Sequence, residues 1–291
     1  MYCLMNENGY LDALREILIK GERRVTRNSV TISLFSVKLD FDLRNQFPLL
    51  TTKKMYWKGI VQELLWFIRA DTNSKHLEET GVNIWKGNSN REFLDKRGLE
   101  TYEEGDCGPI YGFQWRHFGA SYDGMHANYD GKGVDQLQNC IDLLKNDPAS
   151  RRIFMSAWNP VQLEEMCLPP CHVSYQFYVS NNKELSCILY QRSGDMFLGV
   201  PFNIASASLL TYILAHMTGL KPGQLTIQIG DAHIYENHIE QVKVQLERST
   251  LKFPTLKIDH PTTNQIEDYA FENFVLENYQ SHPTIPAAMI A

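Results

Sequence analysis

The segment 172–192 limits the fold most strongly, because two alternating stretches stand on either side of a short polar turn. From 173 to 179 every second side chain is apolar or aromatic, and Asn181-Asn182 separate this stretch from a second one over 184–192. An alternation with a period of two residues is the pattern of a β-strand with one buried face. We therefore predict a β-hairpin with a longer loop, and with it a sheet.

The spacing of apolar residues predicts the elements around this hairpin. They are helices over 9–20, 56–70, 134–145 and 204–218, and strands over 31–43, 152–158 and 225–229. Residues 72–118 are rich in glycine and aromatic side chains, which favours a functional loop region with short helices. Because the sequence contains no internal repeat and no linker, its simplest fold is a single mixed α/β domain over residues 1–291.

Charge and hydropathy exclude several functions. The formal net charge of −6 disfavours nucleic-acid binding as the main task, because such binding needs clustered Lys and Arg. No apolar run is long enough to span a bilayer, and the first residues lack the pattern of a secretory signal. We therefore expect no membrane partner, reduced thiols and a cytoplasmic location, with the nucleus as the alternative.

The cysteines do not have metal-ligand spacing. The chain contains six, and Cys167 and Cys171 are four residues apart with no Cys or His pair at ligand spacing nearby. Tetrahedral zinc sites need such pairs. We expect no metal site.

Cys171 is the candidate nucleophile. Two prolines precede it and fix the backbone, and it opens the first predicted strand. Neighbours on a strand point to opposite faces, so His172 should not pair with Cys171 as a catalytic base. The thiolate then needs a nearby arginine to lower its pKa. The alternative is an unreactive structural cysteine at the start of a strand.

Arginines could supply that charge and hold an anionic substrate. Arg192 ends the second strand of the predicted hairpin, where a guanidinium could serve both the thiolate and a phosphate. Arg151-Arg152 form a second basic doublet just before a predicted strand. The alternatives are a surface ion pair for Arg192 and solvation for the doublet.

Polar groups elsewhere could bind a nucleotide. Asn203 precedes a predicted helix, which favours an N-cap, but its amide could also read the edge of a pyrimidine. His233 and Tyr235 share a face of an extended segment and could bind a sugar hydroxyl, with a buried core histidine as the alternative. Glu63 lies inside the apolar helix 56–70, an unusual place for a carboxylate.

Together these motifs make the chain resemble the thymidylate synthase family, the folate-dependent enzymes that methylate deoxyuridylate. The resemblance extends from about residue 9 to residue 291. The matching segments are Phe47–Lys53, Glu63–Phe67, Asn83–Trp85, Gly108–Arg116, Asp135-Gln136, Arg151-Arg152, Leu168–His172, Gln191–Asp195, Gly199–Ser206 and Gly230–Tyr235.

The resemblance implies the fold and the catalytic residues. It implies an α/β fold of the α+β type, with a large twisted mixed sheet flanked by helices and a sheet face that forms a homodimer interface. By similarity, Cys171 adds to carbon 6 of the uracil ring, and carbon 5 then attacks the one-carbon unit of the folate. Glu63 and Tyr111 match residues that move protons at the ring, and Arg192 lies beside the thiolate.

The resemblance also assigns the binding residues. Those expected to bind the deoxyuridylate (dUMP) are Arg27, Arg151, Arg152, Arg192, Ser193, Asp195, Asn203, His233 and Tyr235. Those expected to bind the folate are Ile84, Trp85, Asp195, Leu198, Gly199, Phe202 and Ala291. The cosubstrate is 5,10-methylenetetrahydrofolate, which donates both carbon and hydride, so no metal or nicotinamide is expected. Arg151 and Arg152 are expected to reach the neighbouring active site of a homodimer.

Three positions depart from the usual family pattern. The family has a glycine-containing loop after the arginine that matches Arg27, whereas this chain reads Asn28-Ser29-Val30. Lys86 stands where an Asp usually follows the Trp, and the chain ends in Ala291 instead of Val or Ile. We expect altered phosphate affinity or loop closure from the first change and looser closure of the tail from the last.

Other functions remain open at this point. A deoxyuridylate hydroxymethylase would form the same adduct but end with water in place of hydride; the cytosine-specific form carries Asp at the position of Asn203. A catalytically silent RNA-binding or interaction homologue is a second alternative. A papain-like hydrolase is a third and would need a histidine within reach of Cys171.

Overall fold

A computed structural model describes residues 6–26, 29–263 and 265–289 of the chain. Arg27, Ile290 and Ala291 therefore lie outside the described residues. The chain divides into two compact units, and each is described by itself. Unit 1 comprises Met1–Tyr56, Val179–Thr262 and Glu272–Ala291, and unit 2 comprises Trp57–Tyr178 and Thr263–Phe271.

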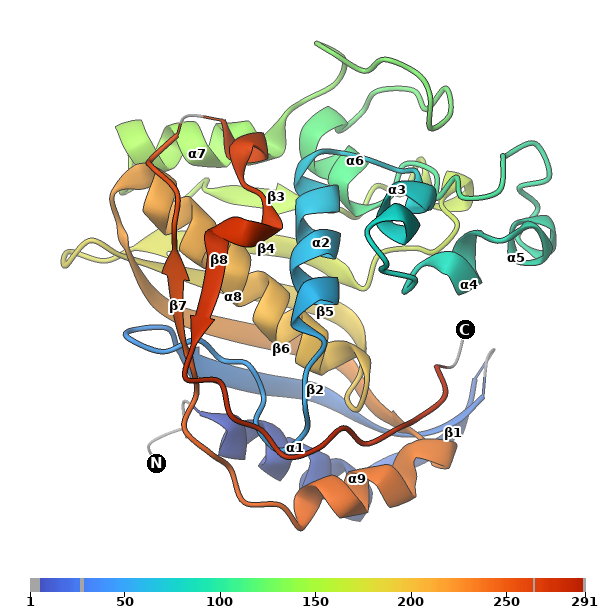
Figure 1. The fold of residues 1–291 in the computed structure, drawn as a ribbon. Helices are drawn as coiled ribbons and strands as arrows, with labels where there is room; N and C mark the ends of the chain where they lie inside the picture. Colours follow the sequence, from blue (N-terminus) through green and yellow to red (C-terminus); the bar gives the residue numbers. More distant parts are fainter. Residues whose placement is uncertain (1–5, 27–28, 264, 290–291) are drawn as a thin grey trace. The chain divides into compact units, whose positions relative to one another are not determined.

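Unit 1 is built on long strands with helices against them (Figure 1). Its helices are α1 (Glu7–Lys20), α8 (Gly199–Thr218) and α9 (Ile239–Leu246), with a short 3₁₀ turn η2 (Glu236–His238). Its strands are β1 (Glu22–Val25), β2 (Val30–Asp42), β5 (Glu184–Asp195), β6 (Lys221–Tyr235), β7 (Thr255–Ile258) and β8 (Phe274–Glu277). The sheet order is β1-β2-β6-β5, while β7 and β8 pair separately.

The β5–α8–β6 segment sets the geometry of unit 1. β5 and β6 pair in parallel, which requires a long crossover, and α8 supplies it. Alternate side chains of these strands are buried under α8, among them Leu189 and Ile227, which are both 0% exposed. α8 ends at Gly219, whose left-handed backbone (φ 69°) lets its N–H bond to the carbonyl of Ala215.

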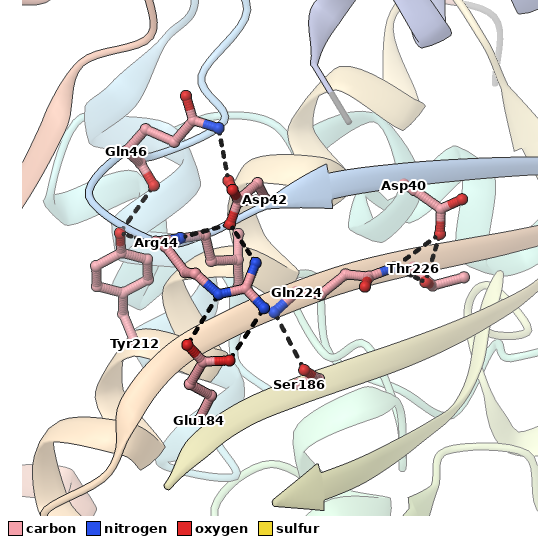
Figure 2. A network of polar contacts seen from close by, with 10 residues as sticks. Asp40, Asp42, Arg44, Gln46, Glu184, Ser186, Tyr212, Gln224 and Thr226 are labelled. Carbon is pink, nitrogen blue, oxygen red and sulfur yellow. Dashed lines mark hydrogen bonds and ion pairs between the residues drawn. The ribbon is translucent and has the colours of Figure 1, made fainter. Parts of the chain in front are cut away.

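Buried and half-buried polar groups fix the remaining segments of unit 1. Glu7 is 1% exposed, and its carboxylate accepts bonds of 2.5–2.8 Å from the backbone and hydroxyl groups of Thr51 and Thr52. Just after β2, the exposed Arg44 forms a two-bond contact of 2.9 and 3.0 Å with Glu184 and a bond of 3.1 Å with Asp42 (Figure 2). These contacts join the ends of β2 and β5.

Unit 2 carries short helices and loops, as the glycine-rich and aromatic segment predicts. Its helices are α2 (Trp57–Ile68), α3 (Ser74–Glu79), α4 (Lys86–Ser89), α5 (Arg91–Lys96), α6 (Tyr111–His117) and α7 (Gln136–Asn146), with 3₁₀ turns η1 (Leu163–Glu165) and η3 (Ile266–Asp268). Its strands β3 (Phe154–Ser156) and β4 (His172–Val179) pair antiparallel.

Helices α2 and α6 approach each other closely in unit 2 because Gly112 lacks a side chain. A Cβ atom on Gly112 would lie 2.2 Å from the backbone oxygen of Phe67. Only glycine permits that approach. The close packing places Tyr111, the first residue of α6, against α2.

The mixed α/β prediction is confirmed: within the described ranges, the sheet of unit 1 combines the parallel pair β5–β6 with the antiparallel pairs β1–β2 and β2–β6, and helices pack against it. The turn between β4 and β5 is closed by bonds from Ser180 N–H to Glu184 O (2.9 Å) and from Lys183 N–H to Ser180 O (2.9 Å). The single domain over residues 1–291 stays a prediction.

Two sequence expectations about the segment 199–218 are corrected. The helix α8 begins at Gly199, so Asn203 lies inside it and is not its N-cap. Pro201 fits there because a first-turn N–H has no partner within the helix. The expectation that no segment could span a membrane was also wrong, since α8 has the length and mean hydropathy (1.3) to do so. As 78% of that window is buried inside the protein, it also fits the core helix of a folded domain.

Candidate active site

Cys171 lies in unit 2 directly before β4, at the end of the Pro-Pro segment. The backbone N–H of Cys171 donates to the hydroxyl oxygen of Tyr111 at 2.9 Å. The cysteine is half-buried, whereas Cys107, Cys140, Cys167 and Cys187 are buried. Burial raises the pKa of Cys107 well above its usual value and that of Cys140 to about 12, so these two thiols are poor nucleophiles.

Aromatic rings surround Tyr111 in unit 2. Its ring stacks on Phe67 at 4.8 Å and meets the edges of Trp85 at 6.0 Å and His172 at 5.4 Å. Such contacts fix ring orientation and add to the burial of apolar surface. The tyrosine that contacts Cys171 is therefore held on three sides.

Glu63 belongs to the same unit 2 cluster. Its carboxylate accepts a hydrogen bond of 2.7 Å from the indole Nε1 of Trp85. Burial raises the pKa of Glu63 from 4.5 to about 7, and the bond from Trp85 opposes part of that rise. A carboxyl group with a pKa near neutrality can both accept and donate protons, as a proton-transfer residue must.

His172 has partners other than a catalytic cysteine. It is 6% exposed, and its Nδ1 lies 3.3 Å from the hydroxyl of Tyr175, while its ring packs against Tyr111. These contacts tie His172 to the aromatic cluster of unit 2. That Cys171 and His172 do not act as a catalytic pair stays a prediction.

In unit 1, the parallel register of β5 and β6 brings together residues from two motifs. Ser193 lies beside Asp231, and Asp195 lies beside His233. The carboxylate of Asp195 accepts from the backbone N–H groups of Phe197 (2.9 Å) and Leu198 (3.3 Å), which turns the chain into α8. The predicted folate residues Leu198, Gly199 and Phe202 therefore follow directly on β5.

Asn203 is oriented by Gln191. The side-chain Nε2 of Gln191 donates to Oδ1 of Asn203 at 2.9 Å, and Gln191 is 0% exposed. This bond places the amide oxygen of Asn203 toward Gln191. A Cβ on Gly199 would lie 4.0 Å from that same oxygen, an ordinary contact distance.

His233 and Tyr235 share one face of β6, as the sequence predicts. Their rings meet edge to face with centroids 5.1 Å apart. Asp231 lies two residues earlier, and its pKa is lowered by its hydrogen bond to His233 and by Arg24, whose guanidinium lies 2.6 Å away. His233 is therefore held beside a carboxylate.

The remaining candidates are placed as follows. Arg151 and Arg152 are exposed on the turn between α7 and β3, and Arg192 is half-buried on β5. Ile84 is half-buried beside Trp85 in the chain. Arg27 and Ala291 lie outside the described residues.

Lys86 has an acidic neighbour that explains its tolerance in place of the usual Asp. Its ammonium lies 3.5 Å from Glu78, whose other oxygen lies 3.7 Å from Lys75. Glu78 thus balances two lysines at the surface of unit 2. The added positive charge predicted near Trp85 is partly neutralised.

Two further residues, Gln191 and Lys53, lie inside the quoted motifs, but the sequence predicts no role for them. Gln191 orients Asn203, as described above. Lys53 is 6% exposed; its ammonium lies 3.8 Å from the centroid of the Phe197 ring and donates to the Phe197 carbonyl, and burial lowers its pKa to about 8. Gln191 stands next to Arg192 and Lys53 next to Thr52 in the quoted segments, and this placement was the available signal.

One cavity in unit 1 overlaps the motif residues only in part. A cavity of about 290 Å³ in unit 1 lies among β1, β2 and β6, lined by Arg24, Phe35 and Asp231 with their neighbours. It shares only Gly230 and Asp231 with the motifs, and Asp231 is already paired with Arg24. Within the described part of the chain, no three His, Cys, Asp or Glu side chains gather to hold a metal ion.

Comparisons with known proteins agree with the motif pattern. The family model described as thymidylate synthase matches residues 8–291. A thymidylate synthase of Homo sapiens is 55% identical over 281 residues, covering 96% of this chain and 89% of the human protein. One from equine herpesvirus 2 is 54% identical and covers 97% of this chain and 98% of its own length. The chain belongs to the thymidylate synthase family.

Proposed function

We propose that this chain converts dUMP to dTMP with 5,10-methylenetetrahydrofolate as donor of both carbon and hydride, and that Cys171 is its nucleophile. As a member of the thymidylate synthase family the chain is a methyltransferase of nucleotide biosynthesis. The observation that carries the assignment of the nucleophile is the half-buried Cys171 on its rigid Pro-Pro segment, held through its backbone by Tyr111. The rest of the proposal gives each residue a role.

Catalysis on the pyrimidine ring begins at Cys171. Its thiolate adds to carbon 6 of the uracil, which makes carbon 5 nucleophilic toward the one-carbon unit of the folate. The proton on carbon 5 must then leave, and Tyr111 and Glu63 are the groups that transfer protons there. The pKa of Glu63, near 7, suits it for both directions of transfer. Arg192 supplies the positive charge that stabilises the thiolate.

The nucleotide is bound through its phosphate, base and sugar. Arg192 and Ser193 bind the phosphate, together with Arg27, Arg151 and Arg152. Asn203 reads the base, and His233 and Tyr235 bind the ribose hydroxyl. The edge-to-face contact of those two rings supports this last role because it fixes both polar tips on one face of β6.

Selection of uracil follows from the orientation of Asn203. Uracil offers an N–H donor at position 3 and a carbonyl acceptor at position 4, whereas cytosine offers the reverse. The bond from Gln191 uses one lone pair of the Asn203 oxygen and leaves the second, while the amide nitrogen remains a donor. An amide held in this way fits the uracil edge.

Residues from separate parts of the chain bind the folate. They are Ile84, Trp85, Asp195, Leu198, Gly199, Phe202 and Ala291. Trp85 offers a buried indole ring for the flat pterin system, and its Nε1 is already satisfied by Glu63. Because the folate supplies both carbon and hydride, the reaction needs no metal and no nicotinamide.

A homodimer completes the proposal. In unit 1, one face of the sheet is covered by α8, while the opposite face exposes Ile188 (49%) and Tyr190 (41%). The strand register places Tyr190 beside Gln228, and Gln228 beside Lys38, so that face carries both apolar and polar groups. Exposed apolar side chains on a sheet face support a dimer interface. Arg151 and Arg152 are exposed and serve the neighbouring subunit's site.

The mass of the product tests the function. Purified protein incubated with dUMP and methylenetetrahydrofolate should yield a methylated nucleotide and dihydrofolate, both measurable by mass spectrometry. A hydroxymethylated nucleotide with tetrahydrofolate would identify the sister hydroxymethylase instead. No change in either compound would favour the silent homologue.

We also propose that the protein works in the cytoplasm, with the nucleus as the alternative. Fluorescence microscopy of the tagged chain in its own host separates the two locations.

A further inference from the structure

Three buried amide side chains form a compact cluster in unit 2. Gln114 on α6, Asn159 after β3 and Gln162 before η1 are 0%, 6% and 5% exposed. Gln114 Nε2 donates to Gln162 Oε1 at 2.9 Å, and Asn159 Nδ2 donates to the side-chain oxygens of Gln114 (3.1 Å) and Gln162 (3.0 Å). We call these three residues the amide cluster.

Backbone groups fix the orientation of every amide in the cluster. Gln114 Nε2 faces the carbonyl of Pro109 (2.8 Å), and Gln162 Nε2 faces the carbonyl of Ala120 (3.1 Å). Asn159 Oδ1 accepts from the N–H of Val161 (3.2 Å). Carbonyls only accept and N–H groups only donate, so no amide can be turned over.

The cluster uses all of its donors. The remaining N–H of Gln162 donates to the carboxylate of Glu165 at 3.3 Å. Each of the three NH₂ groups therefore has two acceptors, and each amide oxygen has at least one donor. A buried polar network that is fully satisfied is rigid, and removal of one member leaves others without a partner.

The cluster joins the two segments that carry Tyr111 and Cys171. Pro109 lies two residues before Tyr111, and Gln114 lies on the same helix. Gln162 begins the stretch that leads to Cys171, and the N–H of Cys167 in that stretch bonds to the carbonyl of Cys107 at 3.0 Å. The bond from Cys171 N–H to the Tyr111 hydroxyl spans the same two segments.

We propose that Gln114, Asn159 and Gln162 are positioning residues that hold the Tyr111 hydroxyl against the backbone of Cys171. This inference rests on the proposed function, which makes Cys171 the nucleophile and Tyr111 a proton-transfer group. The amide cluster touches neither substrate nor reacting atoms and acts through Tyr111. A shift of about 1 Å in such a group can cost on the order of 100-fold in rate.

The test replaces Gln162 by Glu and, separately, by Met. Glu places an oxygen against the Ala120 carbonyl and the Glu165 carboxylate, while Met removes the polar atoms at similar volume. With dUMP and methylenetetrahydrofolate, kcat should fall by roughly 10- to 100-fold while KM for dUMP stays within about threefold. Gln114→Met is a second probe at the opposite end of the cluster, and thermal unfolding identifies which variants fold.

A double-mutant cycle with Tyr111→Phe separates positioning from general damage. In the Tyr111→Phe background the hydroxyl is already gone, so Gln162→Glu or Gln114→Met should lower kcat by less than about threefold further. A purely structural effect would lower kcat by the same factor in both backgrounds. Gln138→Glu on α7 is the matched control, because among the described residues the Gln138 side chain bonds to Asp142 alone, and it should leave kcat unchanged.

The outcomes distinguish the inference from the function on which it rests. Failure of the unmodified protein to turn over would overturn the proposed function itself. Normal turnover, with a loss on Tyr111→Phe but none in any folded cluster variant, would overturn only the positioning role. Equal losses in both backgrounds would overturn it as well.

Discussion

Glu63 and Asn203 show how single side chains acquire chemistry from their surroundings. Each would be ordinary on a surface, but partial burial and one directed hydrogen bond change what it can do. Trp85 donates to Glu63, and Gln191 donates to Asn203. The sequence identified both candidates by their segments, but their partners are distant in sequence, so the bonds could not be read from spacing.

The raised pKa of Glu63 predicts that this carboxyl group titrates near neutral pH. With its pKa raised to about 7 by burial, the carboxyl should hold its proton below that pH and lose it above. Because the folded pKa lies above the unfolded value of 4.5, this group's contribution to stability falls as the pH rises from about 4.5 to 7. The fluorescence of Trp85, which bonds to Glu63, should change across the same interval.

That titration has clear controls. Glu63→Gln should abolish the fluorescence change, and Trp85→Phe should identify the indole that reports it. A transition near pH 4.5, or one that persists in Glu63→Gln, would rule out the raised pKa.

The proposed role of Asn203 in reading the base predicts that its replacement changes the preference for uracil over cytosine. Asn203→Asp replaces the amide donor by a carboxyl group, which suits the amino group of cytosine better than the carbonyl of uracil. The ratio of kcat/KM for the uracil nucleotide to that for the cytosine nucleotide should fall by at least about tenfold. Unchanged selectivity in a folded variant would remove the edge-reading role from Asn203.

Helices and strands position these side chains, and most were predictable from apolar spacing. The errors arose where tertiary contacts override a local signal. Apolar spacing predicts a strand that ends at residue 229, before Gly230, yet β6 continues to Tyr235. A Cβ at position 230 would lie 2.9 Å from the Arg192 carbonyl, so a glycine fits there inside the strand. The glycine marks a close approach of two strands. Likewise α8 begins at Gly199, whereas apolar spacing predicts a helix that begins at residue 204.

The tight packing at Gly112 predicts that adding one methyl group there, on α6, lowers catalytic activity. In Gly112→Ala the new Cβ would lie 2.2 Å from the Phe67 carbonyl, so α2 and α6 must separate and Tyr111 must move. We expect a stability loss of roughly 1–3 kcal/mol, together with reduced kcat. Urea unfolding and steady-state kinetics measure the two effects.

Gly219→Ala is the control for that prediction. Nothing lies within 4 Å of a Cβ at Gly219, so only its left-handed backbone is strained. It should cost about 1 kcal/mol and leave kcat unchanged. Equal kinetic effects of the two substitutions would contradict the steric explanation.

At the scale of the whole molecule, the family and the mixed α/β fold followed from the order of motifs. The division into two compact units did not, because the chain passes between them without a linker composition. The candidate residues fall into both units, with Cys171, Tyr111 and Glu63 in one and Asn203 and His233 in the other. The homodimer stays a prediction, which rests on the family resemblance and on no local pattern.

The shared site of the proposed homodimer predicts complementation between two inactive variants. Cys171→Ser lacks the nucleophile, and Arg151→Ala/Arg152→Ala lacks the donated arginines. After subunit exchange, half of the dimers are mixed and each holds one complete site, so activity should return to about a quarter of the unmodified level. Mixed dimers that form, as sedimentation and affinity tags can establish, but remain inactive would contradict donation of these arginines.

Covalent capture of the pyrimidine tests the central claim most directly. The protein is incubated with a fluorinated deoxyuridylate and methylenetetrahydrofolate, and its intact mass and peptide masses are measured. The account predicts a mass increase equal to both ligands, located on Cys171 and absent in Cys171→Ser. An unmodified Cys171, or an adduct on any other residue, would contradict it.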